Sequence, residues 1–143
     1  MGRCAALPMS AGLQPSTQSL EILMIASIAI IDDDIDVRES TRQLLRSRGY
    51  LTLAFATAED FLRSGEVIQV SCIVTDVRMP GMGGVALQAR LVDQGNCVPI
   101  IFVTAFFEEK LKEQVLAAGA HGFLVKPYAE ASLINCIETA LKN

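Results

Sequence analysis

Several features that mark common functional classes are absent from this 143-residue sequence. Its 12 Lys and Arg residues are outnumbered by 16 Asp and Glu residues and form no basic run, which argues against direct DNA binding by this chain. The four cysteines include no CxxC pair and have no histidine-rich partner, which argues against a zinc site. The single histidine, His121, stands in a predicted loop, and we interpret it as a surface residue rather than a catalytic base.

Membrane and secretion signals are also missing. The apolar run Leu20–Ile31 contains two polar residues, whereas a membrane-spanning helix needs about 18 or more apolar residues in succession. This run leads into Asp32 rather than to a cleavage site, which argues against a signal peptide. Residues 1–24 are rich in Gly, Pro and Ser without periodicity, so we expect a flexible leader or an extension ahead of the true translation start. We therefore predict a cytoplasmic protein with one domain over residues 25–143.

What the sequence does contain is a regular alternation of short apolar runs with amphipathic stretches. The predicted strands are Ile25–Ile31, Leu51–Ala56, Ser71–Thr75, Val98–Val103 and Gly122–Val125, and the predicted helices are Asp36–Arg48, Ala58–Ser64, Gly84–Gln94, Glu108–Ala118 and Glu130–Leu141. Right-handed crossovers leave few topologies for five such strand–helix units. The sequence therefore predicts an α/β fold, a five-stranded parallel sheet with helices on both faces.

Charged residues stand where three of the predicted strands end. Asp32 and Asp33 follow the first strand, Asp76 follows the third, and Lys126 follows the fifth. Because open parallel sheets bind ligands at the carboxyl ends of their strands, we expect these side chains to meet in one pocket. Carboxylates this close repel one another unless a cation binds there, and oxygen-only ligands favour Mg²⁺ or Mn²⁺ over zinc. The sequence thus predicts a pocket for a divalent cation and a phosphoryl group.

The residues at these strand ends suit phosphoryl transfer. Asp76 can attack phosphorus as a carboxylate nucleophile, while a metal ion and Lys126 offset the charge on the transferring group. Thr104, at the end of the fourth strand, can donate a hydrogen bond to a phosphoryl oxygen. Each residue taken singly has a simpler interpretation, since aspartates after a strand are often helix N-caps. The joint pattern favours a site.

Four motifs, arriving in this order, resemble those of the receiver domain of two-component response regulators. They are Ile30–Asp34, Val74–Gly84, Val103–Ala105 and Ala118–Tyr128. The resemblance extends over residues 27–143 and implies the flavodoxin-like fold of that family. It also implies a phosphoacceptor signalling domain that is not an enzyme on separate substrates, because it catalyses only its own phosphorylation and dephosphorylation.

The resemblance implies a role for each acidic residue. Asp76 would accept a phosphoryl group from the phosphohistidine of a sensor histidine kinase. Asp33 would bind Mg²⁺ directly and Asp32 largely through water, while Asp76 and the backbone carbonyl of Arg78 complete the protein ligands. Thr104 and Lys126 would then hold the phosphoryl group. The peptide bond that follows this lysine is expected to be cis, as in the family.

The family resemblance also implies a switch. Thr104 would move toward the phosphoryl group and Phe123 would turn into the space it leaves, which changes a surface that controls an output domain or partner protein. That surface consists of the predicted segments 108–118, 122–125 and 130–141, and a second copy of the chain can associate through it. Phe123 lacks the hydroxyl of the tyrosine found in many family members, so we expect coupling by packing alone. The motif spacing resembles that of receivers that drive DNA-binding output domains.

Two bulky residues stand beside the expected site. Arg78 lies two residues after Asp76, and Phe106 lies two residues after Thr104. In the receiver domains that this sequence resembles, both positions flank the path by which water reaches the acyl phosphate. We therefore expect these two side chains to slow its hydrolysis.

Two other functional classes remain open. In a phosphatase of the haloacid dehalogenase type, Ile30–Asp34 would be the opening motif and Asp32 the nucleophile, but the loop around Asp76 is then unexplained. A receiver-like interaction module that never takes phosphate usually lacks one of the acidic or lysine positions, whereas all are present here. Mg²⁺-dependent binding of beryllofluoride at Asp76 separates the three possibilities.

Overall fold

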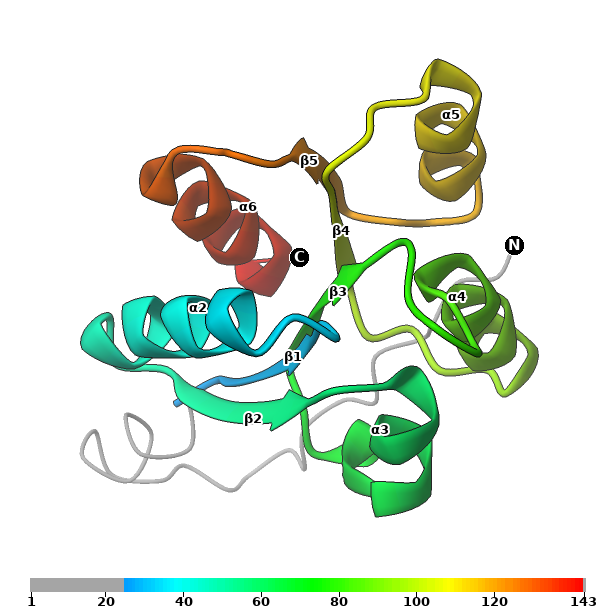
Figure 1. Cartoon of the computed structure of the whole chain (residues 1–143). Helices are drawn as coiled ribbons and strands as arrows, with labels where there is room; N and C mark the ends of the chain where they lie inside the picture. Colours follow the sequence, from blue (N-terminus) through cyan, green and yellow to red (C-terminus); the bar gives the residue numbers. More distant parts are fainter. Residues whose placement is uncertain (1–24, 143) are drawn as a thin grey trace.

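The computed structural model describes residues 25–142. Five parallel strands form one sheet in the order β2-β1-β3-β4-β5, and helices cover both faces (Figure 1). The predicted fold class is therefore confirmed. The leader predicted for residues 1–24 lies outside the described residues. Within the described part, none of the helices combines the length and the apolar character that a membrane span requires.

Every predicted strand and helix is present in the predicted order, and their bounds differ only at the ends. The strands are β1 (Ser27–Ile31), β2 (Leu51–Phe55), β3 (Cys72–Asp76), β4 (Ile100–Thr104) and β5 (Gly122–Val125). The helices are α2 (Ile35–Ser47), α3 (Ala58–Ser64), α4 (Gly84–Asp93), α5 (Glu109–Ala117) and α6 (Glu130–Lys142). A short 3₁₀ helix, η1 (Glu66–Ile68), follows α3 and was not predicted from the sequence.

The side chains of each strand alternate between two core layers. Ile28 and Ile30 of β1 belong to the layer formed with α2 and α6, whereas Ala29 and Ile31 belong to the layer formed with α3, α4 and α5. Figure 1 shows these two sets of helices on opposite faces of the sheet. Strands buried on both faces carry apolar residues at nearly every position, which explains the uninterrupted apolar runs in the sequence.

Because all five strands are parallel, their carboxyl ends lie at the same edge of the sheet. Ile31 of β1 pairs with Thr75 of β3, and Asp76 pairs with Val103 of β4. The chain leaves β1 through α2 on one face and leaves β3 through α4 on the other (Figure 1). A crevice at the strand ends is expected where the connections diverge in this way. The residues predicted for the site lie at these strand ends or directly after them.

Candidate functional site

Three carboxylates meet at this edge of the sheet. Asp32, Asp33 and Asp76 each offer a carboxylate oxygen, and these oxygens all lie within 4.8 Å of one another. Asp32 and Asp76 are buried, with 2% and 9% of their surface exposed, whereas Asp33 is exposed. The structure therefore brings together residues that two separate strand ends supply.

Lys126 is the cation of this cluster. Its Nζ donates hydrogen bonds to Asp32 Oδ2 at 2.9 Å and to Asp76 Oδ2 at 3.0 Å. The lysine is held by its backbone N–H, which donates to the carbonyl of Thr104 at 2.7 Å, and its peptide bond to Pro127 is cis. Burial lowers the pKa of Lys126, but the hydrogen bonds to the two carboxylates outweigh it and the pKa is raised. The ammonium is therefore charged at neutral pH.

The three aspartates that follow β1 have different contacts. Asp34 is the N-cap of α2 and accepts hydrogen bonds from two backbone N–H groups of the first turn. Asp32 and Asp33 therefore do not cap this helix. The N–H of Asp34 donates to Asp32 Oδ1 at 2.9 Å, and the Arg38 guanidinium donates to the Asp32 carbonyl at 2.7 Å. Burial raises the pKa of Asp32, although the hydrogen bond from the Asp34 N–H and the charge of Lys126 oppose the rise. Asp33 projects from the same turn as an exposed carboxylate.

Asp76 closes β3 and opens a tight loop. One carboxylate oxygen, Oδ1, accepts the backbone N–H of Arg78 at 3.2 Å, which leaves Oδ2 for the lysine. A hydrogen bond from the N–H of Gly84 to the carbonyl of Val77, 2.9 Å long, closes this loop. A Cβ at position 84 would lie 2.5 Å from the Asp76 carbonyl oxygen, so this turn requires glycine.

The loop after β4 lies beside the same site. Thr104 is buried, and its hydroxyl both accepts the N–H of Phe106 and donates to the carbonyl of Phe106, each at 3.2 Å. The Arg78 guanidinium forms an ion pair with Glu108, which links the loops that follow β3 and β4. No pattern in the sequence indicated this glutamate. The Arg78 side chain is half exposed and Phe106 is 66% exposed, so both bulky residues lie at the surface near the site.

Phe123 packs between the core and a second aromatic residue. It is half-buried against the α3, α4 and α5 layer, and its ring meets the Phe107 ring edge to face, with centroids 6.3 Å apart. Lys112 of α5 places its ammonium 6.0 Å from the centre of the Phe107 ring. Phe123, the predicted switch residue, therefore contacts the same loop whose residue Phe106 is hydrogen-bonded to Thr104.

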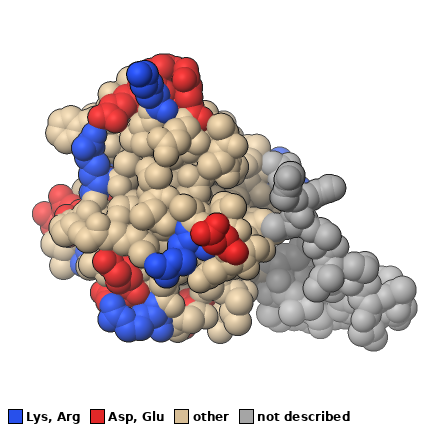
Figure 2. Space-filling model, turned by 90° about the vertical axis from the view of Figure 1, so that its right-hand side faces the viewer, with Lys and Arg blue, Asp and Glu red and all other residues tan. Residues whose placement is uncertain are grey.

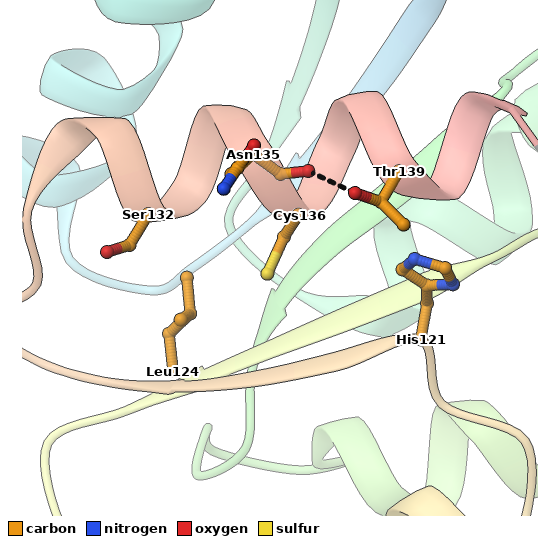
Figure 3. Close-up of a pocket in the computed structure, with 6 residues that line it drawn as sticks. All are labelled: His121, Leu124, Ser132, Asn135, Cys136 and Thr139. Atoms are coloured by element: carbon orange, nitrogen blue, oxygen red, sulfur yellow. Dashed lines mark hydrogen bonds between the residues drawn. The ribbon is translucent and has the colours of Figure 1, made fainter.

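His121 lies elsewhere, in a pocket between β5 and α6 (Figure 3). The pocket has a volume of about 330 Å³ and is lined by His121, Leu124, Ser132, Asn135, Cys136 and Thr139. The close-up shows the imidazole beneath α6, near Thr139. None of the clustered carboxylates lines this pocket, which agrees with the interpretation that His121 is not the base of the strand-end site.

The carboxylate cluster fits a hard divalent cation. Asp32, Asp33 and Asp76 offer oxygen donors alone, and their three negative charges exceed the single positive charge of Lys126. Mg²⁺ takes one or two carboxylates and keeps several waters, and Mn²⁺ accepts the same ligands. The donor set therefore fits either ion, while the roles predicted for the single residues remain predictions.

Comparisons with known proteins agree with this geometry. The model of the response regulator receiver domain family matches residues 28–138. "Response regulator protein TmoT" of Ectopseudomonas mendocina is 37% identical over 80% of this chain and 52% of its own length, and "Transcriptional regulatory protein FixJ" of Azorhizobium caulinodans is 37% identical over 80% of this chain and 54% of its own length. The chain thus spans about half the length of the curated relatives it matches.

A solved structure extends the likeness to three dimensions. The structure of the response regulator StyR superposes with a TM-score of 0.77 at 39% identity, over 82% of this chain and 59% of that one. The family acts in signalling rather than in metabolic catalysis. From its sequence, its fold and the carboxylate cluster at its strand ends, the chain belongs to the receiver domain family of response regulators.

Proposed function

We propose that this domain accepts a phosphoryl group on Asp76 from the phosphohistidine of a sensor histidine kinase. The observation that carries the proposal is the convergence of Asp32, Asp33 and Asp76 with Lys126 at one edge of the sheet. An oxygen of Asp76 forms the new bond to phosphorus, and the histidine nitrogen leaves with the electron pair of the P–N bond. The domain catalyses this step, and later hydrolysis, on itself alone.

The acidic cluster would hold Mg²⁺, or Mn²⁺ in its place. Asp33 would be a direct ligand, Asp32 would act largely through water, and Asp76 and the Arg78 carbonyl would complete the protein donors. When bound, the ion supplies positive charge beside the phosphoryl oxygens. The exposure of Asp33 suits a residue that exchanges water for metal, whereas the burial of Asp32 beside Lys126 suits a residue that keeps its hydrogen bonds.

Lys126 and Thr104 would hold the phosphoryl group once it is attached. Lys126 already donates to Asp76 Oδ2, so it can turn one of its N–H donors to a phosphoryl oxygen. The Thr104 hydroxyl would have to leave the Phe106 carbonyl to donate in the same way. That change moves the loop that carries Phe107, which contacts Phe123. The surface of α5, β5 and α6 would thereby respond to phosphorylation.

We infer that this surface controls a transcriptional output. The support is the relative whose name is "Transcriptional regulatory protein FixJ", of which this chain matches about half. DNA contact would belong to the output domain, because this chain has a net charge of −4. On the described face in Figure 2, Lys and Arg lie beside Asp and Glu rather than gathering in a basic patch. We further propose a cytoplasmic location and self-association through α5, β5 and α6.

The lifetime of the acyl phosphate would depend on the residues at the mouth of the site. Arg78, held by Glu108, and Phe106 stand on the two loops that flank Asp76. We propose that these side chains hinder the in-line approach of water and so slow hydrolysis.

Fluorine NMR of beryllofluoride, a phosphoryl mimic, tests the proposed function. Wild-type protein should give a bound signal that requires Mg²⁺, and Asp76→Asn should lose it while the control Asp93→Asn, which alters an exposed acid at the end of α4, keeps it. A signal that persists in Asp76→Asn would favour a dehalogenase-like use of Asp32. No bound signal in wild type would favour a module that never takes phosphate.

A further inference from the structure

A carboxylate outside the cluster holds the middle of the loop that follows Asp76. Glu59, in the first turn of α3, accepts a hydrogen bond on Oε2 from the backbone N–H of Met82 at 3.0 Å. Within the described part of the chain, this is the hydrogen bond that joins residues 79–82 to another element. Helix α3 contributes no residue to the carboxylate cluster, yet through this bond it contacts the loop that follows Asp76.

The glutamate and the loop fit one another closely at Gly81. This glycine has φ +75°, a left-handed conformation, and a Cβ there would lie 2.6 Å from Glu59 Oε2. The second carboxylate oxygen, Oε1, is buried and has no hydrogen-bond partner among the described residues. The bond from Met82 lowers the pKa of Glu59, so the carboxylate is charged at neutral pH. Burying a carboxylate oxygen without a hydrogen-bond partner costs free energy, so its presence in a folded protein calls for an explanation.

The position of this loop bears directly on the site. Its first residue, Val77, is bound to β4, because the Val77 N–H donates to the Val103 carbonyl at 3.1 Å. The Val77 carbonyl in turn accepts from the N–H of Gly84, where α4 begins. Between these ends, Met79 and Met82 pack against the core, and Glu59 supplies the polar contact. Arg78, whose carbonyl is a proposed metal ligand, lies within the span that these contacts hold.

We propose that Glu59 is a positioning residue that sets the metal affinity of the site by fixing the loop after Asp76. This inference rests on the proposed function, because it assumes that the Arg78 carbonyl is a ligand. The contact requires an oxygen acceptor rather than a charge. A glutamine can therefore replace the glutamate, and an alanine cannot.

Isothermal titration with Mg²⁺ on the full chain tests the proposal. Glu59→Ala should weaken Mg²⁺ binding about fivefold, the loss expected from one hydrogen bond to a charged acceptor acting at a distance from the ligand, and Glu59→Gln should stay within about twofold of wild type. Asp60→Ala is the matched control. Asp60 is an exposed acid on the same helical turn, and its carboxylate forms an ion pair with Arg63 rather than a contact with the loop. It should bind Mg²⁺ like wild type.

A second readout separates positioning from general stability. The rate of phosphorylation by acetyl phosphate at limiting Mg²⁺ should fall in Glu59→Ala and recover at saturating Mg²⁺, whereas a loss of folded protein would lower it at both. Unchanged Mg²⁺ affinity in a folded Glu59→Ala protein would overturn the inference, as would an equal loss in Glu59→Gln. If wild type binds Mg²⁺ but takes no phosphate, the proposed function fails while the affinity comparison still decides this inference.

Discussion

Replacing Asp33 by asparagine should stabilise the metal-free protein and remove most of its response to Mg²⁺. Asp33 is an exposed carboxylate within 4.8 Å of the carboxylate oxygens of Asp32 and Asp76, and Lys126 pairs with those two rather than with Asp33. Without a bound cation its charge is repelled by both neighbours. The change to asparagine keeps the shape of the side chain and removes that repulsion.

The size of the effect follows from the geometry. Two unit charges 4.8 Å apart, the upper limit for these oxygens, repel by about 0.9 kcal/mol in a water-like medium, and exposed Asp33 faces two such neighbours. Lys126 cancels roughly half of their combined charge. Asp33→Asn should therefore raise the free energy of unfolding by about 1 kcal/mol in EDTA. In contrast, Mg²⁺ at 100 times its Kd should stabilise wild type by about 2.7 kcal/mol and the variant far less.

Urea denaturation in EDTA and in saturating MgCl₂ measures both quantities. The order of stability should reverse, with the variant above wild type in EDTA and below it in Mg²⁺. Glu113→Gln, an exposed charge removal on α5, is the control and should follow wild type in both buffers. A variant that is less stable than wild type in EDTA, or that gains as much from Mg²⁺, would refute the reasoning.

Three further results are expected. Asp32→Ala should lose less Mg²⁺ affinity than Asp33→Ala in isothermal titration, and equal losses would contradict the water-mediated role of Asp32. Arg78→Ala/Phe106→Ala should release radiolabelled phosphate about tenfold faster, equivalent to about 1.4 kcal/mol of barrier, and identical decay rates would show that this pair does not screen the site. Burial raises the pKa of the Cys72 thiol from 9.0 to about 12. The free energy of unfolding should therefore fall between these pH values, because the unfolded chain loses a proton that the folded chain keeps, and Cys72→Ala should show a flatter fall in urea titrations.

The fold was predictable because its main signals are local. Buried parallel strands appear in the sequence as apolar runs, and turn residues and helix caps mark the ends of the strands and helices. The bounds of the strands and helices were predicted less accurately. The fourth strand was predicted from Val98, but it begins at Ile100 because Pro99 has no N–H for the ladder and contributes only its carbonyl, which accepts from Ile73 at 2.9 Å. The short helix η1 carries no periodicity long enough to predict it.

The site was predictable where its residues follow strand ends and not where they meet by tertiary packing. Topology alone places Asp32, Asp76 and Lys126 at one edge of the sheet. Glu59 and Glu108 contact the loop after Asp76 from a helix and from another loop, and these contacts depend on side-chain directions that no sequence spacing encodes. Both are ordinary acidic residues in amphipathic or polar stretches, so the sequence offered no signal for them.

The central claim is that Asp76 is the phosphoacceptor, and intact-mass measurement after incubation with acetyl phosphate tests it most directly. Wild type with Mg²⁺ should gain the mass of a single phosphoryl group, and the gain should vanish in EDTA and in Asp76→Asn. A phosphorylated peak of unchanged height in Asp76→Asn would contradict the account.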